Sequence, residues 1–324
     1  MRILTTGVTG FVGGHLTELL AAEGGHTLAG LSRKAAWPPE WSHLAGAVEL
    51  HALDLHDGAG VESLIREFRP DWLFHLAGYA NAGKSFREPD ACWRDNLDAT
   101  RTLYDAVARS GLTPRTLFVS TGLVYGDAET PGVALTEDAP LHPASPYAAS
   151  KAAADILSYQ VTRSPGLPVV RVRLFNQTGP RQSADYAVPN FAKQLAEIAV
   201  GVREPTLQTG DLSSSRDLSD VRDVVAAFRL LIERGTPGEV YNAGSGVALR
   251  MQDVLDTLVE LSGLRVSVTR KPDDGRAADT AVTRADATKL RRATGWVPRI
   301  GFAQTLRDTL DYWRLVTPPR SSPA

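Results

Sequence analysis

The sequence predicts an α/β fold in which a doubly wound parallel sheet is followed, on the C-terminal side, by a smaller mixed α/β domain. Over the first 178 residues, short apolar runs alternate with helical patterns. This alternation is typical of parallel sheets with helices on both faces. A glycine-rich turn follows the first apolar run directly. After about residue 178 the segments become shorter and turn residues more frequent, which indicates a second unit.

Composition and charge restrict the class of protein. The chain has 324 residues, of which 43% are hydrophobic and 22% charged, and its formal net charge is -2. These values are ordinary for a globular protein and predict neither nucleic-acid nor membrane binding. The only cysteine is Cys92, so we expect no internal disulfide and no metal site. Met1 leads directly into a strand, and no apolar run approaches a membrane span, which predicts a cytoplasmic protein without a signal peptide.

The glycine-rich turn predicts a dinucleotide site. Residues 2–6 read as a short strand, the pattern G-x-x-G-x-x-G follows, and a helical pattern begins at Gly14. This order makes a tight turn, lets the backbone approach a pyrophosphate, and directs a helix N-terminus at its negative charge. We therefore expect a Rossmann-type sheet, with an ordinary strand–helix turn as the alternative. The predicted cofactor contacts in this segment are Gly7, Thr9, Gly10, Phe11, Val12 and Gly13.

The end of the second strand indicates which dinucleotide binds. This strand is predicted over residues 26–31, and Ser32, Arg33 and Lys34 follow it. NAD(H) usually meets an acidic residue here, whereas a cationic side chain suits the 2′-phosphate of NADP(H). The sequence therefore favours NADP(H), bound through Ser32 and Arg33, with NAD(H) as the alternative. A solvated basic loop is the interpretation without function.

The third strand adds two predicted cofactor contacts, Asp54 and Leu55, which follow an apolar run over residues 48–53. Asp54 either accepts a hydrogen bond from the adenine amino group or caps the helix that begins near Asp57. Both roles use the same carboxylate, and the residues alone leave the choice open.

The fourth strand, predicted over residues 71–78, ends in small side chains. A cofactor can therefore lie against the backbone at Leu76 and Ala77. His75 lies inside this strand, so we expect a core histidine with satisfied hydrogen bonds. A long helix is predicted over residues 88–110.

The fifth strand and the helix after it carry a pair of residues suited to proton transfer. Thr121 ends the strand predicted over residues 115–121, and ligands bind at the carboxyl ends of such strands. Tyr147 and Lys151 lie four residues apart, which places them on one face of a helix. A nearby ammonium lowers the pKa of a phenol, so the pair can exchange a proton with an alcohol or ketone oxygen. Alone, this spacing is common on solvated helix faces.

The second half is predicted in coarser outline. A sixth strand covers residues 168–175. Further helices are expected near 186–201, 220–234, 249–263 and 302–316, with strands near 206–209, 239–243 and 265–269. We predict a dinucleotide-binding domain over residues 1–178 with interleaved parts near 206–243, a substrate-binding domain mainly over 179–316, and a tail over 317–324.

The glycine turn, Thr121 before Val-Tyr-Gly, and the Tyr147/Lys151 pair occur in a fixed order along the chain. This set resembles the extended short-chain dehydrogenase/reductase family, whose members are NAD(P)-dependent nucleotide-sugar epimerases, dehydratases and reductases. The resemblance covers nearly the whole chain. It implies that Tyr147 exchanges a proton with the sugar C4 oxygen, that Thr121 hydrogen-bonds the same oxygen, and that Lys151 holds the nicotinamide ribose. It also implies a homodimer formed through the Tyr147 helix and the long helix before it.

The resemblance extends to the segments that bind substrate in this family. The segment R-L-F-N-Q-T-G-P matches a motif whose asparagine contacts the substrate, and S-R-D-L-S-D-V-R-D matches one whose arginine binds the diphosphate, its aspartates at 220 and 223 being structural or capping. Arg276 matches a second diphosphate arginine, but Ala277 stands where the family usually has proline. A surface ion pair is the alternative for each arginine. The implied substrate contacts are Thr121, Asn176, Asn190, Lys193, Arg216 and Arg276.

Two segments narrow the choice among the reactions that members of this family catalyse. Dehydratases of this family carry an Asp-Glu pair after the Ser/Thr, and here Gly122 and Leu123 follow Thr121. The cations after the second strand favour a dissociable NADPH, and so a net reductase. Together with F-A-K-Q, the R-D-x-x-D-V-R-D spacing and T-G-W-V-P at residues 294–298, they most closely resemble the family's reductases that convert GDP-4-keto-6-deoxy-mannose to GDP-rhamnose. The alternatives are an NAD-dependent 4-epimerase of a UDP-hexose or UDP-uronate, another reductase of a nucleotide-linked 4-ketosugar, and a non-catalytic dinucleotide-binding protein.

Overall fold

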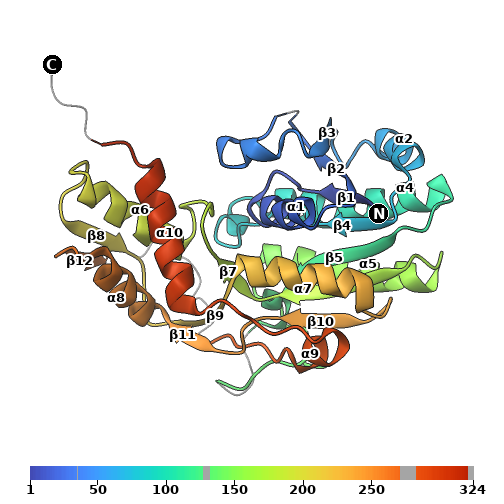
Figure 1. Ribbon diagram of the computed structural model, residues 1–324. Helices are drawn as coiled ribbons and strands as arrows, with labels where there is room; N and C mark the ends of the chain where they lie inside the picture. The colour runs from blue at the N-terminus through green and yellow to red at the C-terminus, as the bar shows by residue number, and fades with distance from the viewer. Residues whose placement is uncertain (35, 127–131, 271–281, 320–324) are drawn as a thin grey trace.

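A parallel sheet of seven strands forms the centre of the protein. The computed structural model describes residues 1–34, 36–126, 132–270 and 282–319. Figure 1 shows the sheet in the right half of the view. Its strands, in spatial order, are β10 (Val240–Ala243), β6 (Val169–Leu174), β5 (Arg115–Thr121), β4 (Trp72–His75), β1 (Arg2–Thr6), β2 (Thr27–Ser32) and β3 (Val48–Ala52). The predicted doubly wound parallel sheet is confirmed.

The strand order reverses between β1 and β4. Strands β1 to β3 run outward in one direction, and β4 to β6 and β10 run outward in the other. In open α/β sheets the ligand lies outside the carboxyl ends of the strands at such a reversal. Here those ends are Thr6 with Gly7, and His75 with Leu76.

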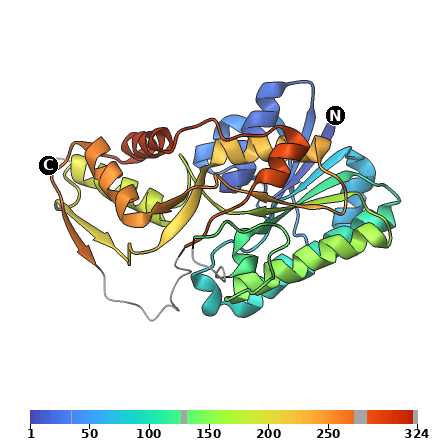
Figure 2. The same cartoon turned by 90° about the horizontal axis from the view of Figure 1, so that it is seen from below.

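Helices cover both faces of the sheet (Figures 1 and 2). On one face lie α1 (Phe11–Glu23), α7 (Val221–Arg234) and α9 (Thr288–Thr294). On the other face lie α2 (Gly58–Phe68), α4 (Ala99–Ser110) and α5 (Pro146–Arg163), the long yellow-green helix in Figure 2. Each helix is anchored by an apolar stripe, as α2 is by Val61, Leu64, Ile65 and Phe68.

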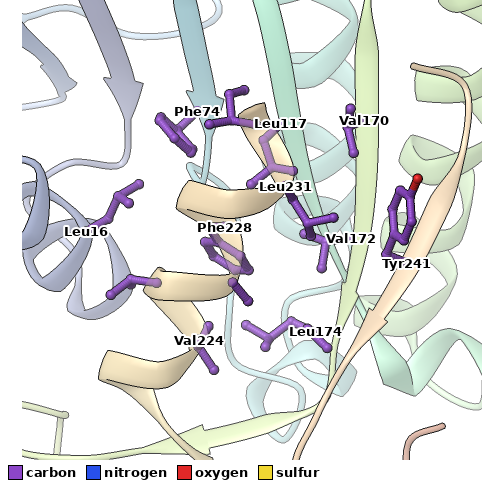
Figure 3. Close-up of a cluster of buried hydrophobic side chains, with 14 of the residues drawn as sticks. Leu16, Phe74, Leu117, Val170, Val172, Leu174, Val224, Phe228, Leu231 and Tyr241 are labelled. Atoms are coloured by element: carbon purple, nitrogen blue, oxygen red, sulfur yellow. The ribbon is translucent and has the colours of Figure 1, made fainter. Parts of the chain in front are cut away.

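The larger core lies beneath α7, as Figure 3 shows. Phe228 and Leu231 of this helix pack on Phe74, Leu117 and other buried residues of the central strands. Because α7 comes from residues beyond 220, the core of the N-terminal sheet depends on the second half of the chain.

A second, smaller unit contains two short sheets and three helices, to the left in Figure 1. The first sheet is β11 (Ala248–Arg250), β9 (Ser215–Asp220) and β7 (Asn176–Thr178); the second is β12 (Ser267–Arg270) with β8 (Thr206–Thr209). The helices are α6 (Ala187–Ala199), α8 (Met251–Ser262) and α10 (Phe302–Val316). These elements share a separate apolar cluster that includes Leu195, Leu207, Leu255 and Leu310.

The structure differs from the prediction in several elements. The expected helix over residues 88–110 is divided into α3 (Pro89–Cys92), a π-helical stretch η3 (Trp93–Asp98) and α4. Strands β7, β9 and β11 and helix α9 were not predicted. β9 is almost entirely polar, so it lacks the β-branched and aromatic signal of a strand. The described residues also contain three short 3-10 helices: η1 (Pro39–Leu44), η2 (Lys84–Phe86) and η4 (Gly122–Tyr125).

Candidate active site

Tyr147 and Lys151 lie in the first two turns of α5. The Ser145 hydroxyl caps this helix by accepting a hydrogen bond from the backbone N–H of Ala148 at 3.1 Å, and Pro146 occupies the first turn. This start places Lys151 against β5, where its Nζ donates to the carbonyl of Val119 at 2.5 Å. The predicted helix with Tyr147 and Lys151 is confirmed.

Thr121 reaches the same place from the end of β5. Its Oγ1 accepts a hydrogen bond from the backbone N–H of Leu123 at 3.2 Å. The Thr121 hydroxyl also hydrogen-bonds with the Tyr147 phenol. Lys151 contacts Val119, two residues earlier on the same strand. The structure therefore brings the three predicted catalytic residues together at the carboxyl edge of the sheet.

The ionisation of this group differs from the expectation. Burial raises the pKa of Tyr147 to about 12, and the hydrogen bond with Thr121 only partly offsets this. Burial also lowers the pKa of Lys151 to about 8, with Asp155 acting in the opposite direction. We expected Lys151 to lower the tyrosine pKa, but its ammonium donates to the Val119 carbonyl instead. In this structure the phenol therefore holds its proton firmly.

The glycine turn has the form that a dinucleotide needs. Gly7 has a φ of +69°, and a Cβ there would lie 2.8 Å from the backbone nitrogen of Ala77. A Cβ on Gly13 would lie 2.2 Å from the carbonyl oxygen of Gly7. Helix α1 starts after Gly10 without a side-chain cap, so its first N–H groups are available to an anion. These features fit a pyrophosphate lying across the turn.

Thr9, Phe11 and Val12 of the turn each contact a different part of the protein. Thr9 Oγ1 lies 3.1 Å from Ser32 Oγ, which links the turn to the end of β2. Phe11 meets the ring of His15 edge to face at 5.3 Å, and Val12 packs against the core under α7.

Arg33 lies on the rim beyond β2 and is largely exposed. Its Nη1 is 3.7 Å from Asp95 Oδ2, and 74% of its side chain is accessible. An exposed guanidinium in a loose ion pair can turn toward an incoming phosphate. This placement fits the predicted contact with a 2′-phosphate.

Asp54 contacts His56 and does not cap α2. Its Oδ1 accepts a hydrogen bond from the backbone N–H of His56 at 2.9 Å and lies 2.8 Å from the His56 ring. The cap of α2 is Asp57, whose carboxylate accepts from Gly60. The capping role proposed for Asp54 is therefore wrong, because the N-cap of α2 lies three residues later, at Asp57. Leu55, beside it, is buried.

His75 is the core histidine that the sequence predicts. The backbone N–H of Ala77 donates to Thr6 Oγ1 at 3.1 Å, and Thr6 Oγ1 lies 2.8 Å from His75 Nδ1. His75 Nε2 lies 2.9 Å from Thr100 Oγ1, which itself donates to the carbonyl of Asn96. Because the Thr100 proton is already used, His75 must donate from Nε2 and accept at Nδ1. The ring is therefore neutral, and it ties the Ala77 backbone to η3.

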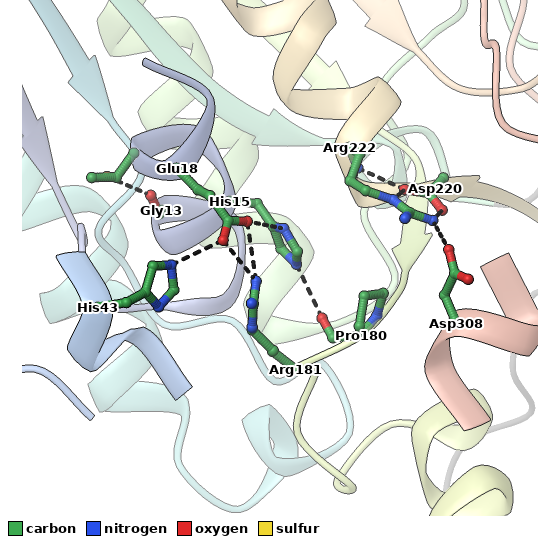
Figure 4. A network of polar contacts seen from close by, with 10 residues as sticks. Gly13, His15, Glu18, His43, Pro180, Arg181, Asp220, Arg222 and Asp308 are labelled. Atoms are coloured by element: carbon green, nitrogen blue, oxygen red, sulfur yellow. Dashed lines mark hydrogen bonds and ion pairs between the residues drawn. The ribbon is translucent and has the colours of Figure 1, made fainter. Parts of the chain in front are cut away.

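A second histidine ties α1 to a segment 165 residues further along the chain (Figure 4). His15 Nε2 lies 3.0 Å from the carbonyl oxygen of Pro180. Arg181 donates to Glu18 at 3.0 Å, and His43 lies 2.9 Å from the same carboxylate. The glycine turn and the segment after β7 are therefore held together.

The two buried histidines predict sensitivity to acid. Burial lowers the pKa of His15 to about 4 and that of His75 to about 3. In the unfolded chain each ring titrates near 6.5, so below that pH the unfolded state binds more protons. Stability is therefore greatest above about pH 7 and falls as the pH drops. At pH 5 we expect each histidine to lower the free energy of unfolding by about 2 kcal/mol, measured by urea denaturation.

His15→Gln separates this effect from other acid-sensitive groups. Glutamine keeps a donor for the Pro180 carbonyl but does not titrate. The loss of stability between pH 8 and pH 5 should shrink by about 2 kcal/mol in this variant. Equal losses in both proteins would contradict the prediction.

Apart from Thr121, the predicted substrate residues that the structure describes lie on three elements of the smaller unit, β7, α6 and β9. Asn176 starts β7, two residues after Leu174, which pairs with Thr121 across β5 and β6. Arg216 lies on β9 and is half-buried, and its Nη1 donates to the carbonyl of Ser215 at 3.2 Å. Asn176 therefore lies directly beyond the reacting edge of the sheet, and Arg216 lies on the strand that pairs with β7. Arg276 lies outside the described residues.

The two candidates on α6 already have partners. Asn190 Nδ2 donates to the carbonyl of Ala184 at 2.9 Å. Lys193 Nζ lies 3.7 Å from Glu197 and 5.7 Å from the centre of the Trp313 ring. Binding a diphosphate through Lys193 would require its side chain to leave these partners.

Aspartates 220 and 223 have the structural roles that were expected. Asp220 caps α7 and pairs with Arg222, which also binds Asp308 at 2.7 Å (Figure 4). Asp223 Oδ2 accepts hydrogen bonds from the backbone N–H groups of Arg299 and Ile300. These contacts join α7 to the segment before α10.

Known proteins share both this sequence and this fold. A profile of the GDP-mannose 4,6 dehydratase family matches residues 4–309. The chain belongs to the GDP-mannose 4,6 dehydratase family. A GDP-6-deoxy-D-mannose reductase of Pseudomonas aeruginosa is 32% identical over 96% of this chain and 97% of its own length. The family assignment agrees with the extended short-chain dehydrogenase/reductase resemblance seen in the sequence.

Two solved structures of this wider group illustrate its range. RMD from P. aeruginosa, complexed with NADPH, has a TM-score of 0.83 and 31% identity over 97% of this chain and 99% of its own. The UDP-glucose 4-epimerase of Thermus thermophilus, in complex with NAD, has a TM-score of 0.86 and 32% identity over 98% and 100%. Other relatives carry the names of dTDP-glucose 4,6-dehydratases. The protein is therefore an NAD(P)-dependent oxidoreductase of nucleotide sugars.

Some site residues carry no motif in the sequence. Tyr186, whose phenol adds to the raised pKa of Tyr147, falls in a loop without a recognised pattern. Asp155 is one helical turn beyond Lys151, and this spacing was the only signal available for it. Within the part of the chain that the structure describes, no helix has the length and apolar character of a bilayer-spanning segment.

Proposed function

We propose that the protein reduces the C4 ketone of GDP-4-keto-6-deoxy-mannose with NADPH, giving GDP-rhamnose. The observation that supports this reaction over a dehydration is the lack of room for a side chain at Gly122. A Cβ at this position would lie 2.8 Å from the buried ring of Phe175. The carboxylate that family dehydratases place directly after the Ser/Thr therefore has no room here. The similarity to a GDP-6-deoxy-D-mannose reductase supports the same choice.

Tyr147 is the proton donor in this proposal. When bound, the nicotinamide supplies the hydride that reaches C4. A ketone reductase needs a proton donor, and the protonated Tyr147 phenol, hydrogen-bonded with Thr121, can serve as one. Tyr147 donates this proton to the C4 oxygen while Thr121 hydrogen-bonds the same oxygen. The Lys151 ammonium then stabilises the phenolate that remains.

The deciding experiment supplies GDP-4-keto-6-deoxy-mannose and NADPH and identifies the sugar formed. We expect NADPH oxidation with stoichiometric GDP-rhamnose. UDP-glucose, UDP-galactose and UDP-glucuronate test the second candidate, a 4-epimerase, which the likeness to the T. thermophilus enzyme favours. Epimerisation without net NADPH oxidation would replace the proposal. NADPH binding without turnover of any nucleotide-linked 4-ketosugar would favour a binding protein.

Arg33→Ala tests the cofactor preference. If Arg33 binds the 2′-phosphate, its loss should weaken NADPH binding by about 10- to 100-fold, the usual effect of losing a charged hydrogen bond. NADH lacks that phosphate, so its affinity should change less than threefold. Cofactor fluorescence titration measures both. Arg101→Ala, which removes another exposed arginine, is the control. Equal losses for the two cofactors would overturn the NADP(H) assignment.

We also propose that Asn176 and Arg216, with Arg276, hold the sugar nucleotide, while Asn190 and Lys193 join them by exchanging partners. The positions of Asn176 and Arg216 beyond the reacting edge support this arrangement. Three guanidinium or ammonium groups suit a diphosphate.

A homodimer through α5 is the proposed assembly. Ile156 and Tyr159 on α5 are 60% and 45% exposed, and Trp93 on η3 is 38% exposed. Apolar side chains grouped on adjacent helices are typical of protein interfaces. Sedimentation velocity would report the mass directly.

The single cysteine in 324 residues supports the cytoplasmic location that we propose.

A further inference from the structure

Two loops about 100 residues apart in sequence meet beside the reacting residues. The first covers residues 78–86 and follows β4, whose end neighbours the Thr121 strand. The second covers residues 183–186 and leads into α6. The Tyr186 hydroxyl donates to the carbonyl of Ala80 at 3.0 Å, and Lys84 Nζ lies 2.9 Å from Asp185 Oδ2. We call these two contacts the clasp.

Each loop has hydrogen bonds of its own, in addition to the two contacts of the clasp. In the first, Asn81 Oδ1 accepts from the backbone N–H of Lys84 at 2.8 Å, and the buried Ser85 hydroxyl donates to the carbonyl of Ala82 at 2.6 Å. In the second, Ser183 accepts from the backbone N–H groups of Asp185 and Tyr186, both at 3.2 Å. The clasp residues are therefore presented by rigid turns, and forming the clasp orders few further groups.

The clasp lies beside the helix of the proton donor, because η2, which carries Lys84, packs against α5. Among the causes that raise the pKa of Tyr147, burial comes first, and the neighbouring Tyr186 phenol adds to it. The Tyr186 phenol also adds to the raised pKa of Tyr79, which lies in the first loop. A tyrosine ring beside the reacting phenol presents an apolar face to whatever lies there, while its hydroxyl is held by Ala80.

We propose that Tyr186 is a substrate-binding residue that covers the sugar ring, and that the clasp holds it in that position once the sugar is bound. The proposal deepens the proposed function, since it rests on a nucleotide sugar being the substrate. The sugar enters when the clasp opens, and Tyr186 closes on its apolar side next to Tyr147. The lone ion pair is exposed, with 56% of Lys84 and 55% of Asp185 accessible, so it opens at little cost.

Three variants test the proposal on the full-length enzyme. Tyr186→Ala removes the ring and should lower kcat/KM for the ketosugar by about 10- to 100-fold. Tyr186→Phe keeps the ring but loses the hydrogen bond to Ala80, and should raise KM about three- to tenfold. Asp185→Asn breaks only the ion pair and should raise KM up to about fivefold. The dissociation constant of NADPH should stay within about twofold in all three, which separates a substrate role from general damage.

Glu239→Gln is the matched control, because it removes a lysine–carboxylate pair of similar exposure, Lys289 with Glu239 at 2.7 Å. Kinetic constants of the control should equal those of the wild type. Wild-type kcat and KM in Tyr186→Ala would overturn the proposal, as would an equal loss of NADPH affinity.

A measurement without turnover separates this inference from the proposed function. In Asp185→Asn and Tyr186→Phe, amide hydrogen exchange at residues 84–88 should become faster than in the wild type, since these amides belong to the opposite loop. Unchanged exchange would disprove the clasp even if the enzyme reduces the expected ketosugar. If the wild type instead acts on another nucleotide sugar, the same kinetic comparison applies to that substrate.

Discussion

Tyr147→Phe should lower kcat for ketosugar reduction by about 10²- to 10⁴-fold, the range that general acid catalysis contributes. The substitution removes one oxygen and leaves the ring in place at the start of α5. Thr121 loses its hydrogen-bond partner, but the glycine turn lies on other elements and is untouched. NADPH should therefore bind within a few-fold of the wild-type affinity. Stopped-flow reduction and cofactor titration measure the two quantities separately.

The same substitution elsewhere on α5 provides the control. Tyr159 is 45% exposed and three turns away from the reacting pair, so Tyr159→Phe should leave kcat unchanged. If Tyr147→Phe kept the wild-type kcat, another group would have to donate the proton. The catalytic assignment of Tyr147, and with it the proposed mechanism, would then be wrong.

Asp155→Ala should destabilise the protein by about 3–5 kcal/mol, because it leaves two buried cations without their shared counter-ion. The Asp155 side chain is fully buried. Its two oxygens bind Arg171 Nη1 at 2.6 Å and Arg173 Nε at 2.9 Å. Both arginines lie on β6, so this carboxylate fastens α5 to the sheet. Chemical denaturation of the two proteins measures the difference.

An exposed ion pair provides the comparison for this prediction. Asp98 is 48% exposed and lies 3.5 Å from Arg101, so Asp98→Ala should cost no more than about 1 kcal/mol. Similar small losses in both variants would show that the buried cluster contributes no more than a surface pair. Because α5 carries Tyr147 and Lys151, the destabilised variant should also lose activity at a lower temperature than the wild type.

The strands of the sheet could be predicted because they are apolar and regularly spaced. β1 to β6 are short buried runs separated by helices, and this local signal suffices to identify them. β9 could not be found this way, because Ser215–Asp220 has one apolar residue. Its stability comes from distant partners, such as the four groups of the 244–246 and 285 segments that donate to the buried Asp217.

The reacting residues could be predicted because their spacing is fixed by one helix and one strand. Their ionisation could not, because it depends on which acceptor the Lys151 ammonium finds. Similarly, the residues after β3 predict a cap, but only the structure shows that Asp57 takes it and that Asp54 holds His56. The contact between Tyr186 and Ala80 joins positions 106 residues apart, and no local pattern encodes it.

β10 and α7 come late in the sequence, and this order affects how the protein folds during synthesis. A nascent chain that has reached only residue 178 contains the glycine turn, Tyr147 and Lys151, yet its sheet is unfinished. β6 is then an open edge, and Phe74, Leu117 and Val172 lack the cover that α7 supplies. Open edges and bare apolar faces favour self-association. The cofactor-binding half therefore cannot complete its fold during synthesis until residue 243 has left the ribosome. A gene shortened before that point would yield aggregates instead of a smaller NADPH-binding protein.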